Sequence, residues 1–127
     1  MKILLTTILA LNICTMPATE VVKEPVGFYT ISAYSYSEGC GENYKTAGGY
    51  APKPYYTVAT SSEYTIGTKL YIEDVGKVQV QDRGDFPSSR IDLHIGHNNP
   101  TTFGLKRRKV YRYKKKVIMK FQKMKWW

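Results

Sequence analysis

Two aspartates, Asp82 and Asp92, lie in the middle of the chain, each within an alternating, β-rich run. The segment between them, residues 83–89, contains the Gly, Asp, Pro and Ser residues that interrupt regular structure. Strands on either side of such a turn can bring both carboxylates to one wall of a cleft. Like charges a few ångströms apart raise one pKa, which leaves a proton donor beside an anion, as glycosidic bond cleavage requires. The alternative interpretation is that both aspartates are ordinary turn residues at strand ends.

Short β-rich segments separated by turn residues predict a mostly β fold. The expected strands are residues 28–34, 55–59, 69–73, 76–82, 90–93 and 109–113. Residues 98–103 predict a short helix, with Asn99 as its cap and Pro100 at its first position. Many short strands with few helical periods favour a small closed barrel.

The segment 35–54 predicts a long loop, and long loops in compact domains tend to be functional or mobile. Tyrosines are concentrated in and around it. A tyrosine offers a flat apolar face and a hydroxyl, which suits packing against sugar rings. The alternative is that about half of these tyrosines fill the core or the barrel mouth.

Several short motifs occur in a fixed order along residues 29–113. They are Ser-Ala-Tyr at 32–34, Ile-Gly-Thr at 66–68, Gln-Asp-Arg-Gly at 81–84, Arg-Ile-Asp-Leu at 90–93, and Phe-Gly at 103–104 followed by Lys-Val-Tyr at 109–111. This ordered set resembles the 3D domain, named for three aspartates, which occurs in membrane-bound lytic transglycosylase A and in small secreted cell-wall proteins. The Asp-Arg-Gly motif is also similar to rare lipoprotein A. The resemblance implies a six-stranded double-psi β-barrel with one or two short helices.

The resemblance also implies a chemistry for the two aspartates. Asp92 corresponds to the acid that protonates the oxygen between N-acetylmuramic acid and N-acetylglucosamine in peptidoglycan. The muramyl C6 hydroxyl then closes onto C1, and an anhydro product forms without water. Asp82 is the expected neighbour that steadies the oxocarbenium charge. For this role Asp92 must stay protonated near neutral pH, which requires burial or a neighbouring anion.

Further residues are expected to contact substrate. They are Tyr34, Thr60, Arg83, Gly84, Asp85, Arg90 and His94. Thr60 stands where the family has its first aspartate, and a hydroxyl carries no charge at neutral pH. We expect Arg83 and Arg90 to point away from Asp92, toward peptide carboxylates of the substrate.

Asp92, His94 and His97 form an Asp-x-His-x-x-His pattern that superficially suggests a metal site. In a strand Asp92 and His94 share one face, but His97 need not. We therefore expect His94 to be a polar partner near the acid, and we expect neither a metal nor another cofactor.

The N-terminal residues predict a secretory signal over residues 1–18, with an uncleaved anchor as the alternative. A linker over 19–27, the barrel domain over 28–113 and a tail over 114–127 follow. The expected location is the cell envelope or the extracellular space. Without Cys14, Cys40 has no disulfide partner, and a loop position is the simplest interpretation of it.

Charge is distributed unevenly along the chain, which has a net charge of +9. All 10 acidic residues lie at or before Asp92, whereas no acidic residue follows it. The excess of Lys and Arg after Asp92 indicates an anionic partner, such as a wall polymer or a membrane surface. The tail, which mixes lysines with apolar residues, can extend the last strand, lie on such a surface or remain a solubilising tail.

Three classes of function remain open from the sequence. The first is a peptidoglycan-cleaving lytic transglycosylase, and the second is an expansin-like glycan-binding module without turnover. The third is a basic surface-binding or nucleic-acid-binding protein. No RNA-recognition motif is evident, so we expect peptidoglycan strands rather than nucleic acid as the partner.

Overall fold

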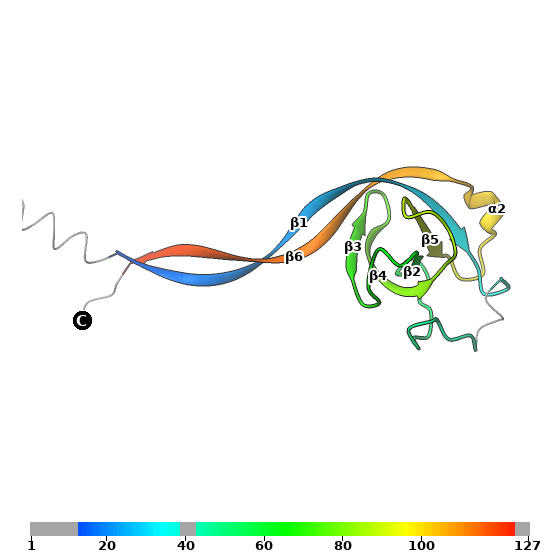
Figure 1. Ribbon diagram of the computed structural model, residues 1–127, viewed down its shortest axis with the longest axis horizontal. Coiled ribbons are helices and arrows are strands. Elements are labelled where there is room, and N and C mark those ends of the chain that lie inside the picture. Colours follow the sequence, from blue (N-terminus) through cyan, green and yellow to red (C-terminus); the bar gives the residue numbers. More distant parts are fainter. Residues whose placement is uncertain (1–12, 39–42, 124–127) are drawn as a thin grey trace, which may run out of the picture. The chain divides into compact units, whose positions relative to one another are not determined.

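The structure of the protein is a computed structural model that describes residues 13–38 and 43–123 (Figure 1). It contains six strands and one short helix in this part of the chain. The strands are β1 (Ile13–Tyr34), β2 (Thr57–Thr60), β3 (Lys69–Ile72), β4 (Gly76–Arg83), β5 (Arg90–His94) and β6 (Lys106–Lys123), and the helix is α2 (Pro100–Phe103). The prediction of a mostly β fold is therefore confirmed.

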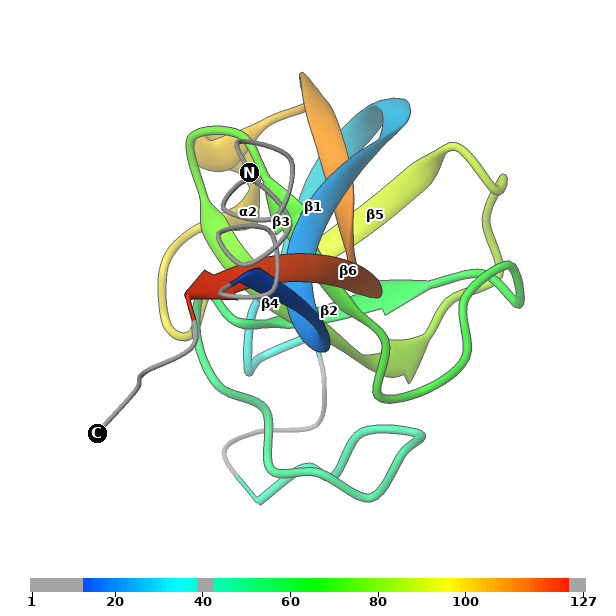
Figure 2. The same cartoon turned by 90° about the vertical axis from the view of Figure 1, so that its left-hand side faces the viewer.

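The six strands form one sheet with the neighbour order β1-β5-β2-β4-β3-β6, and this order closes on itself (Figure 2). The pairs β1–β5 and β2–β4 are parallel. The pairs β2–β5, β3–β4 and β3–β6 are antiparallel. Parallel partners cannot be joined by a tight hairpin, so the connections between them must cross over.

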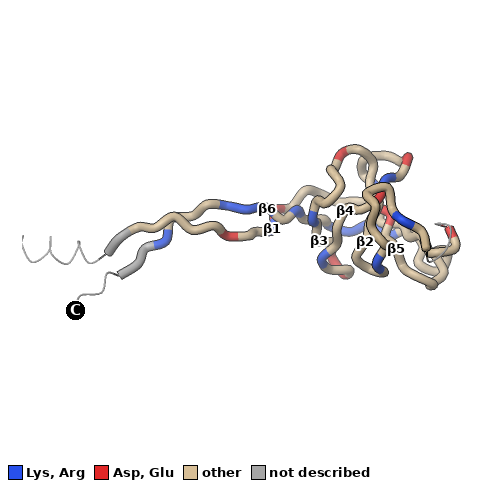
Figure 3. The backbone as a smooth tube through the Cα atoms, turned by 90° about the horizontal axis from the view of Figure 1, so that it is seen from below, with Lys and Arg blue, Asp and Glu red and all other residues tan. Residues whose placement is uncertain are grey.

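The chain divides into two compact units. One unit is Lys23–Tyr113, which holds β2 to β5 and the hydrophobic core. The other contains the described residues before Lys23 and after Tyr113, where segments of β1 and β6 run side by side (Figures 1 and 3). Asp82 and Asp92 both lie within Lys23–Tyr113.

The core is built from one side chain in every two along the strands of Lys23–Tyr113. Ile31, Val58, Val80, Ile91 and Leu93 are all at most 1% exposed and belong to one hydrophobic cluster. Because successive side chains of a strand point to opposite faces, the residues between these positions face away from the core. Those intervening positions hold the polar residues of the candidate site.

The short helix and its cap were predicted correctly. Asn99 accepts a hydrogen bond from the Thr101 amide over 2.9 Å, and Pro100 occupies the start of α2. This arrangement is favourable because the cap side chain pairs with an amide that has no partner within the helix. Proline suits the first position because it has no amide hydrogen that would be left unpaired there.

The structure corrects the predicted linker over 19–27, because these residues lie within strand β1. Val21, Val22 and Val26 are β-branched residues that suit a strand, and this preference prevails over the breaking effect of Pro25. Strand β6 continues to Lys123, so the tail extends the last strand, which was one of the three alternatives expected for it. Most of the predicted signal (1–12), Cys40 and residues 124–127 lie outside the described residues, and the signal remains a prediction.

Candidate active site

Asp82 and Asp92 lie on either side of a single alanine in the middle of the sheet. Ala59 of β2 pairs with Asp92 of β5 on one side and with Asp82 of β4 on the other. Ser32 of β1 pairs with Asp92 and continues the row. Neighbouring strands lie about 4.8 Å apart, so the two aspartate backbones are about 10 Å apart. The small Ala59 side chain leaves space between their carboxyl groups.

A β-bulge places Asp82 in this row. Val58 pairs with Val80, but the next residue, Ala59, pairs with Asp82 rather than with Gln81. In a regular strand Asp82 would share the core-facing side of Val80, because residues two apart lie on one face. The extra residue in β4 reverses that assignment, since a bulge re-aims the side chains that follow it.

Asp82 is 5% exposed and its carboxylate is held by several donors. Oδ2 accepts from the Tyr44 hydroxyl over 2.7 Å and from the Tyr34 hydroxyl over 3.4 Å. Oδ1 accepts from the backbone amides of Ala47 and Arg83, each over 2.9 Å. Hydrogen bonds to a charged group are among the stronger ones in proteins, so Asp82 fixes the loop that follows β1 against β4.

The same loop approaches β4 closely at Gly48. The Gly48 amide donates to the Gln81 carbonyl over 3.0 Å. A Cβ at this position would lie 2.6 Å from Ile66 Cγ2 and 2.9 Å from the Gln81 carbonyl oxygen. The contact therefore requires glycine for space, and this close approach seats Ala47 beside Asp82.

Replacement of Gly48 by alanine should lower the free energy of unfolding by about 1–3 kcal/mol, because the added methyl must displace backbone. Chemical denaturation of Gly48→Ala measures this loss. Ala47→Ser, a change on the exposed neighbouring side chain, serves as the control and should leave the midpoint nearly unchanged. An unchanged midpoint in Gly48→Ala would contradict the close docking of the loop.

Asp92 has a different environment from Asp82. Its Oδ1 accepts from Ser32 Oγ over 2.9 Å, and Arg90 Nε in turn donates to Ser32 Oγ over 3.0 Å. Burial raises the pKa of Asp92 above its ordinary value, whereas the Ser32 hydrogen bond and the Arg90 charge lower it, and the negative charges of Glu38 and Asp82 raise it further. The net direction is upward, and burial is the main cause.

Burial, one of the two causes expected from the sequence, is the main reason that the pKa of Asp92 is raised. Repulsion from Asp82, the other expected cause, is the smallest of these effects. The physical reason is that the two aspartates are separated by the width of β2. Two carboxyl groups with separate environments can still take different roles, one as acid and one as anion.

The two aspartates line a common cavity of about 250 Å³. Five predicted site residues line it: Tyr34, Asp82, Arg83, Gly84 and Asp92. Four residues that the sequence reasoning did not single out as site residues also line it: Glu38, Tyr44, Ala59 and Phe86. The tyrosine-rich composition of the loop was the signal for Tyr44. Ala59 carried no signal, because its position depends on strand pairing.

Four predicted substrate contacts lie outside the lining of this cavity. Thr60 is fully buried, and it donates to the Ser61 carbonyl over 3.0 Å and accepts from Arg83 Nη1 over 3.3 Å. Asp85 is exposed in the turn after β4. Thr60 alternates with Ala59 along β2 and therefore faces the core side.

Arg90, the third of these residues, acts through Ser32. Its guanidinium donates to Ser32 Oγ and lies 5.5 Å from the centre of the Phe86 ring. No ion pair joins Arg90 or Arg83 to Asp92 among the residues that the structure describes. The Arg90 charge nevertheless lowers the pKa of Asp92, so Arg90 acts on this carboxyl group without an ion pair, and the expected orientation of the two arginines stays a prediction.

His94, the fourth, is fully buried beneath two tyrosines. Its ring centroid lies 5.0 Å from that of Tyr34 and 4.5 Å from that of Tyr36. Nδ1 accepts from the Gly96 amide over 3.3 Å, while Nε2 has no hydrogen-bond partner within the described part of the chain. Burial lowers the pKa of His94, and the nearby Asp82 charge opposes this shift. His94 therefore packs against Tyr34 and Tyr36 and does not line the cavity.

The lowered pKa of His94 predicts a loss of stability in mild acid. The unfolded chain takes up a proton near pH 6.5, whereas the folded chain resists it, so the free energy of unfolding should fall as the pH drops below about 6.5. Denaturation curves between about pH 7 and 5.5 measure this fall. His94→Phe should flatten the dependence and His97→Gln should retain it. An equal slope in His94→Phe would contradict this assignment.

A metal site built on Asp92, His94 and His97 has no support in the geometry. Among residues 13–38 and 43–123, no three His, Cys, Asp or Glu side chains are grouped as metal ligands would be. The Tyr36 ring packs against both histidines, with its centroid 4.5 Å from that of His94 and 4.9 Å from that of His97.

Compared with known proteins, the chain matches no family model, and no curated protein sequence is significantly similar to it. Within the described residues, no helix has the length and apolar character needed to cross a membrane.

Proposed function

We propose that this protein is a peptidoglycan-active lytic transglycosylase of the cell envelope, with Asp92 as the general acid. The observation that carries the proposal is the pairing of Asp82 and Asp92 with the same residue, Ala59, beside a cavity that both side chains line. The 3D-domain resemblance supplies the substrate class. The closed strand order with its parallel pairs supports a double-psi β-barrel as the finer fold.

The two carboxyl groups support different roles. Asp92 has a raised pKa and one hydroxyl donor, so it is the group suited to hold a proton and release it to the glycosidic oxygen. Asp82 accepts hydrogen bonds from two backbone amides, which can only donate. This favours its role as a fixed negative charge near the developing oxocarbenium ion.

The lining of the cavity supports a saccharide substrate. The aromatic rings of Tyr34, Tyr44 and Phe86 offer apolar faces, and Arg83 offers a cation for a substrate carboxylate. Gly84 leaves room for the Phe86 ring, because a Cβ on Gly84 would lie 1.8 Å from one of its carbons. The absence of a side chain at Gly84 therefore allows the Phe86 ring to lie close to the backbone beside the cavity.

Digestion of purified peptidoglycan by the full chain tests the proposal. Mass spectrometry of the soluble products should reveal 1,6-anhydromuramyl ends. Products with ordinary reducing ends would indicate hydrolysis by water instead, and the absence of any product would contradict the enzymatic proposal.

A glycan-binding module without turnover is the second candidate. It is favoured by Thr60, which stands where the resembling family has an aspartate and is buried away from the cavity. In this case β6, along which basic residues are coloured blue in Figure 3, supplies a second contact. Lys115, Lys116 and Lys120 are exposed on this strand. Such lysines suit anionic wall polymers or a membrane surface. Retention on washed peptidoglycan without product, reduced by salt and by Lys→Gln changes at these three positions, would support this candidate.

A further inference from the structure

Two further cavities lie in the Lys23–Tyr113 unit, and neither shares a lining residue with the Asp82–Asp92 cavity. Each has a volume of about 330 Å³, and Tyr55 and Phe103 line both of them. Because two aromatic side chains belong to both linings, we treat the two cavities as two halves of one site. We call it the Tyr55–Phe103 site.

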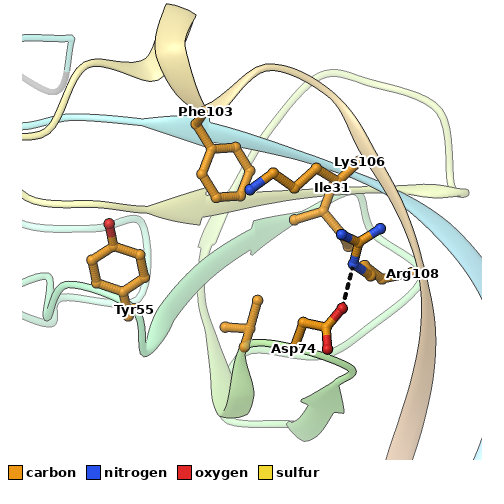
Figure 4. A pocket seen from close by; sticks show the side chains of 7 residues that line it. Ile31, Tyr55, Asp74, Phe103, Lys106 and Arg108 are labelled. Atoms are coloured by element: carbon orange, nitrogen blue, oxygen red, sulfur yellow. Dashed lines mark ion pairs between the residues drawn. The ribbon is translucent and has the colours of Figure 1, made fainter.

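One half of the site is cationic. Lys106 and Arg108 line it from β6, and Asp74 lines it from the turn between β3 and β4 (Figure 4). Arg108 Nε pairs with Asp74 Oδ2 over 3.0 Å, and the Lys106 ammonium lies 4.1 Å from the centre of the Phe103 ring. Two cations and one carboxylate leave a net charge of +1, which suits a ligand with a single negative charge.

The Lys106 ammonium retains its capacity to donate hydrogen bonds. Among the described residues it makes no hydrogen bond or ion pair and lies over the Phe103 ring, which accepts no conventional hydrogen bond. Arg108 has Nε directed at Asp74 and Nη1 donating to the Arg107 carbonyl over 2.9 Å. Lys106 is therefore the main anchor for an incoming anion, and Arg108 adds charge.

The other half is neutral, polar and aromatic. Asn98, Asn99 and Thr102 line it together with Tyr55 and Phe103. Amide and hydroxyl groups beside aromatic faces are the groups that recognise the hydroxyls and the apolar faces of a sugar ring. The neutral half thus fits the ring of a saccharide, while the cationic half fits an acidic group on it.

Tyr55 has a backbone conformation that residues other than glycine rarely adopt. Its φ is 58°, in the left-handed region, and such residues cost on the order of 1–3 kcal/mol unless the surroundings hold them. Its amide donates to the His94 carbonyl over 2.7 Å, and its hydroxyl accepts from Asn98 Nδ2 over 2.8 Å. Yet the residue is 47% exposed, so packing in the core does not explain why a large side chain is present at this strained position. Backbone strain of this kind is concentrated at ligand sites.

We propose that the Tyr55–Phe103 site binds an acidic saccharide, with the sugar ring between Tyr55 and Phe103 and the carboxylate on Lys106 and Arg108. This inference does not rest on the proposed peptidoglycan activity. It assigns a binding role to residues that the candidate active site leaves unused.

Titration of the isotopically labelled full chain with D-glucuronate, followed by NMR, tests the proposal. Saturable shifts should appear at Tyr55, Phe103 and Lys106, with a Kd on the order of millimolar, as expected for a ligand of this size. D-glucose, which lacks the carboxylate, should bind at least about tenfold more weakly. Benzoate, which has the carboxylate but no sugar hydroxyls, should also bind more weakly.

Lys106→Gln should weaken glucuronate binding by about tenfold or more, because it removes one charged hydrogen-bond donor. Lys109→Gln is the matched control, since it removes the same charge from the same strand at a position whose ammonium lies 5.4 Å from the Tyr111 ring. Tyr55→Gly should lose binding without a lower melting temperature, because glycine adopts a positive φ without strain.

Several results would overturn the inference. They are an absence of saturable shifts at the site, equal affinity for glucose, benzoate binding at least as tight as glucuronate binding, and wild-type affinity in Tyr55→Gly or Lys106→Gln. Asp92→Asn should bind glucuronate as the wild type does. Loss of peptidoglycan activity and loss of glucuronate binding are therefore separable outcomes.

Discussion

Asp92→Asn should reduce the release of anhydromuramyl products by about 100- to 10,000-fold. An amide of the same shape cannot donate a proton to the glycosidic oxygen, and general acid catalysis contributes a factor of this size. The substitution keeps a carbonyl oxygen that can accept the Ser32 hydrogen bond, so the geometry of the row is preserved. Product release is measured by mass spectrometry against the wild type.

The control for this variant is Glu73→Gln, which neutralises an exposed carboxylate in the turn between β3 and β4. It should retain wild-type product release. Equal activity in Asp92→Asn and Glu73→Gln would refute the assignment of Asp92 as the acid.

A stability measurement distinguishes lost chemistry from lost folding in the Asp92→Asn variant. The pKa of Asp92 is raised by burial, so its charged form opposes folding at neutral pH. Its favourable contribution is present below the unfolded pKa and disappears as the pH rises through the raised folded value. Asp92→Asn should therefore be at least as stable as the wild type near pH 7. A less stable variant would instead indicate that Asp92 has a structural role.

Asp82→Ala should have the second largest effect, a loss of about 2–4 kcal/mol in the free energy of unfolding. It removes the acceptor for the Tyr44 hydroxyl and for the amides of Ala47 and Arg83. Donors left without partners in a buried site cost more than the mean value of a hydrogen bond. Urea denaturation measures the loss, and hydrogen exchange should be faster at the Ala47 and Gly48 amides.

Asp82→Asn provides the graded control. Its side-chain carbonyl can still accept from the Ala47 amide, so the loss of stability should be smaller than in Asp82→Ala. If both variants unfold at the wild-type midpoint, Asp82 does not hold the loop against β4, and the description of the site is wrong at that point.

The strands and the helix were predictable because their signals are local. β-branched and aromatic residues mark β3, β4 and β5, and the Asn99–Pro100 pair marks the start of α2. Similar local signals misled at residues 19–27, where Pro25 indicated a linker but the flanking valines continue β1. In that segment, the strand preference of several residues outweighs one residue that disfavours a strand.

The convergence of Asp82 and Asp92 depends on pairing that no local signal encodes. The alternation from Val78 through Val80 assigns Asp82 to the core face, and only the bulge opposite Ala59 moves it beside the cavity. Thr60 illustrates the converse, because a residue expected to contact substrate faces the core instead. Register between distant strands decided both outcomes, and register is set by the packing of the whole sheet.

The most direct test of the central claim is a measurement of the pKa of the Asp92 carboxyl group by carbon-detected NMR titration. The account predicts a value above the ordinary aspartate value of about 3.9, with activity declining as the pH rises through it. A value at or below the ordinary one would show that Asp92 is ionised at neutral pH, and would contradict its role as the proton donor.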